Sequence, residues 1–180
     1  MNGAEKNVLF LKTLAYNIKR TMELDPAAHS KLEVFWLYPH IKALGFHRIA
    51  HWFWVRNHTF IARWISNIAR NWTGIEIHPG ATIGRGLVID HGMGVVIGET
   101  AVIGDDCQLY HGVTLGGTGS VHVKRSSHFR RWRLCWFWGK MLGNITLHKG
   151  AKVGANAVLL KDVPAYATAV GVPARIIEKK

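Results

Sequence analysis

The sequence is short of several features that mark particular classes of protein. It has two cysteines, Cys107 and Cys135, which is too few for a disulfide framework. It has no uninterrupted apolar run of about 18 residues and no signal-peptide core near Met1, so neither a membrane-spanning helix nor secretion is predicted. Its 19 glycines follow no three-residue period, which excludes a collagen-like chain. We therefore expect a cytoplasmic protein.

Acidic residues are also scarce. Asp and Glu together number 11 against 23 Lys and Arg, which gives a formal net charge of +12. This excess makes a polyanionic partner, such as nucleic acid, one candidate. Intrinsic disorder is excluded because 48% of the residues are hydrophobic. With 180 residues, the chain is long enough for one domain, or for one domain with an appendage.

Residues 1–73 and residues 74–180 follow different apolar periods. In the first region apolar residues recur at helical spacing, and Asp25 followed by Pro26 predicts the start of a helix. The aromatic run at residues 52–54 is interpreted as packing surface between helices, with membrane-surface contact as the alternative. Two helical stripes are formed by Leu11, Leu14, Ile18 and Met22, and by Phe60, Ile61, Trp64, Ile65 and Ile68.

From Ile77 onward the apolar period is six residues. This period is typical of hexapeptide β-helix repeats, in which each turn stacks an aliphatic residue on its copy in the next turn. A sandwich of short strands is the alternative, but the hairpin signals that it needs about every 8 to 12 residues are missing. The repeating positions are Ile77, Ile83, Ile89, Val95, Ile97, Ile103, Leu109 and Leu115, then Phe129, Cys135, Met141, Leu147, Val153 and Leu159.

Four motifs in this region carry a family resemblance. They are residues 74–80 (GIEIHPG), 89–92 (IDHG), 96–104 (VIGETAVIG) and 112–119 (GVTLGGTG). With them the chain resembles the serine O-acetyltransferases, and residues 25–26 and 45–52 of the helical region are similar to the same family. Residues 171–176 (GVPARI) are similar to the hexapeptide acyltransferases in general. The resemblance therefore covers nearly the whole chain.

The resemblance implies both a fold and an activity. The fold is a left-handed parallel β-helix over residues 74–180 that follows N-terminal helices in residues 1–73, assembled as a homotrimer or a hexamer. The activity is acetyl transfer from acetyl-CoA to the hydroxyl of L-serine, which gives O-acetylserine and CoA in cysteine biosynthesis. The last residues, 175–180, lack the long tail ending in isoleucine through which the family docks O-acetylserine sulfhydrylase, and this argues against that partner.

The resemblance also assigns roles to individual residues. His91 would be the general base, because a histidine pKa lies near the operating pH. Glu76 stands where the family places an orienting carboxylate, usually aspartate. Asp25 and Asp90 would bind the substrate L-serine. The planar guanidinium of Arg125 would pair with the serine carboxylate through two hydrogen bonds. From the residues alone, Asp25 could equally be a helix N-cap and His91 a hydrogen-bonded corner residue.

Three further positions match the coenzyme site of the family. Gly117, Lys152 and Ala155 would lie near acetyl-CoA, although a corner glycine and a solvated surface lysine are the ordinary roles of such residues. No metal is expected, because the other histidines show no ligand spacing with one another or with cysteine. In particular, His47 and His51 lack the intervening glutamate of a zinc-protease helix.

Residues 126–139 depart from the family. The tract reads SSHFRRWRLCWFWG where the family continues with His-Pro and glycine-rich repeats. One hypothesis is a frame slip, with one nucleotide inserted near Arg125 and one deleted near Gly139. With one allowed choice of codons, the other frame encodes HPTFGDGVCVGFGA, which is family-like throughout. Sequencing the gene across this stretch tests the hypothesis.

The tract predicts impaired activity. Ser126 stands where the family has a second active-site histidine, and His128 lies two residues away on a strand, where it is not expected to substitute. The tryptophans at 132, 136 and 138 replace small corner residues and should overpack this coil. Two other functions stay open: a noncatalytic interaction protein, and single-strand nucleic-acid binding through the tract's arginines and tryptophans. The frame slip accounts for those same residues, which argues against nucleic acid.

Overall fold

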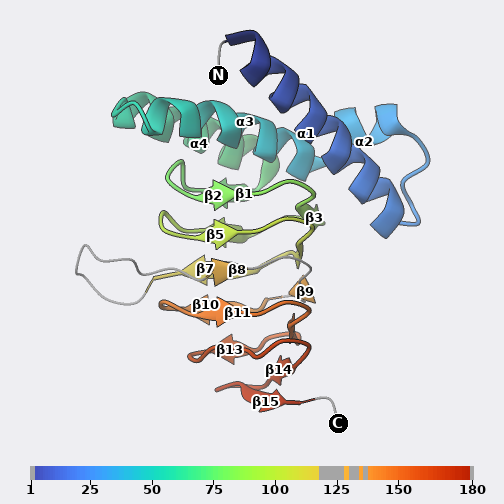
Figure 1. Cartoon of the computed structure of the whole chain (residues 1–180), viewed down its shortest axis with the longest axis vertical. Coiled ribbons are helices and arrows are strands. Elements are labelled where there is room, and N and C mark those ends of the chain that lie inside the picture. Colours follow the sequence, from blue (N-terminus) through green and yellow to red (C-terminus); the bar gives the residue numbers. More distant parts are fainter. Residues whose placement is uncertain (1–2, 118–127, 130–133, 136–137, 179–180) are drawn as a thin grey trace.

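The computed structural model describes residues 3–117, 128–129, 134–135 and 138–178. In this part of the chain four helices lie at one end of a tall stack of short strands, and the C-terminus lies at the other end (Figure 1). The helices are α1 (Gly3–Leu24), α2 (Lys31–Leu37), α3 (Pro39–Trp54) and α4 (Thr59–Thr73).

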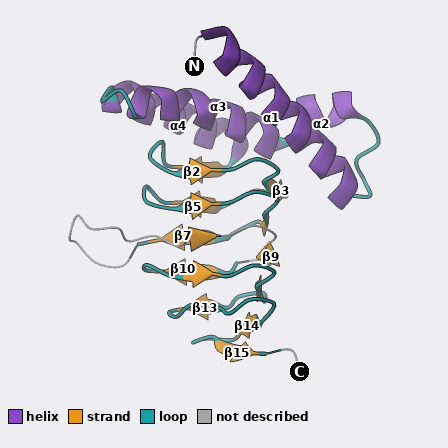
Figure 2. Cartoon of the chain, viewed as in Figure 1, coloured by secondary structure: helices purple, strands orange, loops and turns teal. Residues whose placement is uncertain are grey.

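Among the described residues, fifteen strands of two or three residues each follow the helices and stack in successive coils (Figure 2). Their bounds are β1 (Ile75–Ile77), β2 (Thr82–Ile83), β3 (Val88–Asp90), β4 (Val95–Ile97), β5 (Val102–Ile103), β6 (Gln108–Tyr110), β7 (Thr114–Gly116), β8 (His128–Phe129), β9 (Leu134–Cys135), β10 (Lys140–Leu142), β11 (Thr146–Leu147), β12 (Lys152–Val153), β13 (Val158–Leu159), β14 (Thr168–Val170) and β15 (Arg175–Ile177).

The strands form three sheets, and each of the first four coils contributes one strand to each sheet. The first sheet has the order β1-β4-β7-β10-β13, the second β11-β8-β5-β2 and the third β15-β14-β12-β9-β6-β3. Every pair is parallel except β14 with β15. The six-residue period is confirmed in the register, because Ile77 pairs with Ile97, Ile97 with Leu115, and so on along the stack. The chain is therefore a parallel β-helix whose core is this column of aliphatic side chains.

The start of the second helix differs from the sequence prediction. Asp25 is not an N-cap: α1 ends at Leu24, and the Asp25 carboxylate accepts a hydrogen bond from the backbone N–H of Ala27 in the following turn. The N-cap of α2 is Ser30, whose hydroxyl accepts from the N–H of Glu33 at 3.1 Å. Because Ser30 and not Asp25 caps the helix, the Asp25 carboxylate can take part in a binding site.

Helices α3 and α4 cover the first coil of the β-helix. Gly74 ends α4 with φ +71, and a Cβ at Gly74 would lie 2.5 Å from Sδ of Met93. Trp54, expected to pack between helices, instead lies edge-on to His78 of the solenoid, with 4.8 Å between ring centroids. Among the described residues, no helix is long and apolar enough to cross a membrane.

Candidate active site

His91 lies at the corner where the chain leaves the third sheet after β3 and turns toward β4 of the first sheet. Its backbone is left-handed, with φ 59, and Gly92 follows with φ 76. A Cβ at Gly92 would lie 2.7 Å from Cδ1 of Ile75, so this corner requires glycine after the histidine. Because the corner is tight, the His91 side chain projects from the β-helix and is 71% exposed.

Two groups lie beside the His91 ring. Oδ1 of Asp90 is 3.8 Å from Nε2 of His91. The ring of His111, from the same corner of the next coil, lies edge-on with 5.7 Å between centroids. His91 is therefore accessible to a substrate and has a carboxylate within reach of its protonated form.

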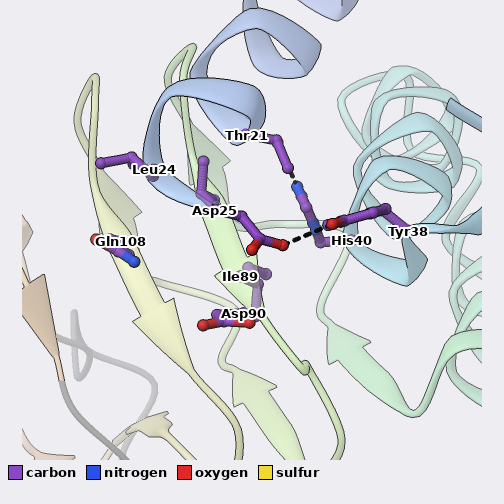
Figure 3. Close-up of a pocket in the computed structure, with 9 residues that line it drawn as sticks. Thr21, Leu24, Asp25, Tyr38, His40, Ile89, Asp90 and Gln108 are labelled. Carbon is purple, nitrogen blue, oxygen red and sulfur yellow. Dashed lines mark hydrogen bonds between the residues drawn. The ribbon is translucent and has the colours of Figure 1, made fainter. Parts of the chain in front are cut away.

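A pocket lies next to this corner, between the helices and the third sheet (Figure 3). It is a narrow hollow between side chains that is partly open to solvent. Asp25 enters it from the end of α1, and Asp90 enters it from β3 (Figure 3). The remaining lining residues are Thr21, Leu24, Tyr38, His40, Val88, Ile89 and Gln108. The structure therefore brings together Asp25 and Asp90, two of the predicted site residues.

The Asp25 carboxylate is held on both oxygens. The Tyr38 hydroxyl donates to Oδ2 at 2.6 Å, and the N–H of Ala27 donates to Oδ1 at 2.8 Å. These bonds, that from Tyr38 foremost, lower the pKa of Asp25, whereas burial raises the pKa of Tyr38. Asp25 is thus ionised at neutral pH, and the pocket presents negative charge to a ligand.

His40 forms a buried wall of the same pocket. Burial lowers the pKa of His40 to about 4, so the ring is neutral at pH 7. Nε2 lies 3.0 Å from the Thr21 hydroxyl oxygen, and that hydroxyl donates its single proton to the carbonyl of Asn17. Because the hydroxyl can then only accept, the His40 proton resides on Nε2.

Glu76 is not in contact with His91 in this chain. It lies at the centre of β1, and its carboxylate accepts a hydrogen bond from Arg70 of α4 at 3.3 Å. Its predicted orienting role stays a prediction, and Asp90 is the carboxylate that the structure places next to the His91 ring.

The three predicted coenzyme residues lie on different sheets. Gly117 follows β7 of the first sheet, whereas Lys152 is on β12 of the third sheet and Ala155 follows it. All three are exposed. Arg125, the predicted carboxylate ligand, lies outside the described residues. Among the described residues, no group of three His, Cys, Asp or Glu could hold a metal ion.

The sequence of this chain is similar to the sequences of known proteins from one family. The serine acetyltransferase of Helicobacter pylori strain 26695 is 54% identical over 166 residues, which is 92% of this chain and 97% of that protein. The enzyme of Bacillus subtilis is 48% identical over 169 residues, 94% of this chain and 78% of its own length. The chain belongs to the serine acetyltransferase family. No family model matches the chain.

Solved structures of the serine acetyltransferase family have the same fold. A serine acetyltransferase from Brucella abortus in complex with coenzyme A superposes with a TM-score of 0.92 at 36% identity, over 96% of this chain and 69% of that one. A serine acetyltransferase in complex with cysteine superposes with a TM-score of 0.94 at 38% identity, over 98% of this chain and 68% of that one.

Trp138 occupies a backbone conformation that favours glycine. Most of the aberrant tract lies outside the described residues, but Trp138 is described and has φ 57 at the corner before β10. A Cβ on Gly112, one coil earlier, would lie 2.4 Å from the Trp138 ring. The restored frame encodes glycine at position 138, which is the residue that a left-handed corner favours.

Sequence reasoning missed Tyr38 and the role of His40. The available signal was the dipeptide of Tyr38 and Pro39, because a residue before proline is driven out of the helical region. Tyr38 is indeed extended, with ψ 118, and it separates α2 from α3. This break aims the Tyr38 ring at Asp25 (Figure 3).

Proposed function

We propose that this serine acetyltransferase transfers the acetyl group of acetyl-CoA to the hydroxyl of L-serine, with His91 as general base. The observation that carries the assignment of residues is the pocket shared by Asp25 and Asp90, which opens beside the exposed His91. An ammonium ion suits a pocket that presents two carboxylates, and the serine hydroxyl oxygen, three bonds from the ammonium nitrogen, can then approach the imidazole.

The reaction needs no covalent enzyme intermediate. His91 removes the serine hydroxyl proton as the oxygen attacks the thioester carbonyl carbon. The tetrahedral intermediate collapses with cleavage of the carbon–sulfur bond, and the imidazolium returns its proton to the CoA thiolate. The products are O-acetylserine and CoA. Oδ1 of Asp90 lies 3.8 Å from Nε2, so a carboxylate stands beside the ring that carries the proton between the two steps.

The remaining assignments come from family motifs. Arg125 would pair with the serine carboxylate, and Glu76 would orient His91 after leaving Arg70. Gly117, Lys152 and Ala155 would contact the coenzyme. CoA-bound relatives support acetyl-CoA as the acetyl donor.

A homotrimer would reconcile the positions of the coenzyme residues. Gly117 lies at the end of a first-sheet strand, and Lys152 and Ala155 belong to the third sheet, so one chain presents them on separate faces. Packing the first sheet of one subunit near the third sheet of another would bring them to one interface. The expected mass in solution is about three times 20.2 kDa for the trimer, or twice that for a hexamer, and a monomer at enzyme concentrations used in assays would contradict this assembly.

Thiol release from acetyl-CoA tests the function. We expect CoA to appear only when L-serine is present, at a rate reduced by the aberrant tract. Equal release with and without L-serine would indicate hydrolysis, and no release together with salt-sensitive binding of an oligonucleotide would favour the nucleic-acid alternative.

A further inference from the structure

We propose that Tyr38 is a positioning residue for the amino group of the acceptor, acting by holding the Asp25 carboxylate in place. This inference rests on the proposed function and extends it, because family motifs pointed to Asp25 and not to Tyr38. The geometry that carries it is the hydroxyl–carboxylate bond of 2.6 Å across the pocket between the two helical segments.

The bond determines which lone pairs of Asp25 remain for a ligand. Tyr38 donates to Oδ2 and Ala27 donates to Oδ1, so each oxygen has one protein donor and further acceptor capacity. Without Tyr38, the carboxylate would be held by the turn alone and could rotate. With it, the carboxylate is held inside the pocket that Asp90 also lines (Figure 3).

Tyr38 is itself fixed by a short chain of contacts. Its ring packs edge-on against His40, with 5.9 Å between centroids and 82° between planes. His40 is 1% exposed and donates through Nε2 to Thr21, which is one helical turn before Asp25 on α1. The end of α1 and the junction between α2 and α3 are therefore joined at two points, and Asp25 lies between them.

The electrostatics of the pocket favour a cation. The buried His40 ring is neutral at pH 7 and does not repel an ammonium ion. The hydrogen bond from Tyr38 lowers the pKa of Asp25, which keeps its negative charge at mildly acidic pH. The titratable groups that surround Asp25 are Tyr38 and His40 from the helices and Asp90, His91 and Tyr110 from the solenoid.

The test is the variant Tyr38→Phe, which keeps the ring and removes the hydroxyl. The variant removes the hydrogen bond from Tyr38 to the charged Asp25 carboxylate. Losing a hydrogen bond to a charged group corresponds to about a tenfold change in affinity, so we expect the KM for L-serine to rise about tenfold. We expect the KM for acetyl-CoA to stay within about twofold of the wild-type value. The pH below which L-serine binding weakens, measured by calorimetry, should move upward, because Asp25 loses the bond that lowers its pKa.

Tyr16→Phe is the matched control. Tyr16 donates to Oδ1 of Asp106 at 2.7 Å and also joins a helix to the solenoid, but neither residue lines the pocket. We expect this variant to lose stability without change in the KM for L-serine or in the pH profile. Equal effects of the two substitutions on the KM would overturn the inference and leave only a structural role for Tyr38.

A double-mutant cycle with Asp25→Asn separates positioning from packing. If Tyr38 acts through the charge of Asp25, adding Tyr38→Phe to Asp25→Asn should raise the KM for L-serine by less than about twofold more. Fully multiplicative effects would overturn the inference. If the wild-type chain neither releases CoA in response to L-serine nor binds L-serine by calorimetry, the proposed function itself fails and the inference falls with it.

Discussion

At the scale of single residues, His91 and Trp138 share an uncommon backbone conformation. Both have positive φ, 59 and 57, and both lie at corners between the third and first sheets. A side chain in this region costs roughly 1–2 kcal/mol relative to glycine. At His91 such a cost is expected of a functional group held in place by the surrounding corner. At Trp138 the described contacts are with His111, Lys140 and Gly112, and none of these gives the tryptophan a role in the proposed reaction.

The backbone at Trp138 leads to a prediction about stability. Alanine at this position keeps the left-handed strain and glycine relieves it, so Trp138→Gly should be more stable than Trp138→Ala by about 1 kcal/mol. Comparing the two small residues cancels the loss of the indole ring. Urea unfolding of both variants measures the difference.

The control for this prediction is Leu160, an exposed residue outside the positive-φ positions. There glycine should be less stable than alanine by about 0.5–1 kcal/mol, the ordinary order. If Trp138→Gly is also the less stable of its pair, position 138 does not favour glycine, and the frame-slip hypothesis loses its structural support.

At the scale of elements, α3 carries two buried histidines that face other parts of the chain. His40 donates to Thr21 of α1, and Nε2 of His47 lies 3.1 Å from the carbonyl oxygen of Ala81 in the solenoid. Burial lowers the pKa of His40 to about 4 and that of His47 to about 3. In the unfolded chain both would take up a proton near pH 6.5.

Lowering the pH should therefore reduce the free energy of unfolding through protonation of His40 and His47 of α3. The folded pKa values lie below the unfolded ones, so the stabilisation is complete above about pH 6.5 and is lost as the pH falls toward 4 and then 3. We expect at least about 1 kcal/mol of unfolding free energy to be lost per histidine between pH 7 and pH 4. Urea unfolding at several pH values measures this loss.

The variant for this test is His40→Gln combined with His47→Gln, which should flatten the fall in stability between pH 7 and pH 4 even if it is less stable overall. The exposed His58 provides the control, since His58→Gln should leave the slope unchanged. An unaltered slope in the double variant would show that other groups govern acid unfolding.

Elements differed in how far the sequence could predict them. The six-residue period predicted the strands and their aliphatic column, because each repeat buries one side chain against its copy in the next coil. The predicted start of the second helix was wrong, because Asp25 and Pro26 have the pattern of an N-cap but form a turn after α1. The pocket could not be predicted from periodicity at all, since it depends on how the helices pack against the third sheet.

At the scale of the whole molecule, residues 126–139 account for much of the unusual composition. Restoring the frame removes three arginines and adds one aspartate, which changes 23 basic and 11 acidic residues to 20 and 12, a net charge of +8. It also removes three of the eight tryptophans. The remaining positive charge suits a coenzyme that carries phosphates.

Restoring this tract should raise activity. A chain carrying HPTFGDGVCVGFGA at positions 126–139, including Ser126→His and Ser127→Pro, regains the second histidine of the family motif. Loss of a positioned catalytic group costs roughly 10²- to 10⁴-fold in rate, so we expect a gain of that order in kcat/KM. Equal activity of the two chains in the CoA-release assay would contradict the prediction.

The central claim is that His91 deprotonates L-serine for direct attack on acetyl-CoA. The most direct measurement is formation of O-acetylserine, followed by NMR alongside CoA release, in the wild-type chain and in His91→Asn. Asparagine tolerates the left-handed backbone, so the variant should fold. We predict one O-acetylserine per CoA in the wild type and a rate roughly 10²- to 10⁴-fold lower in His91→Asn. CoA release without O-acetylserine, or an unchanged rate in the folded variant, would contradict the account.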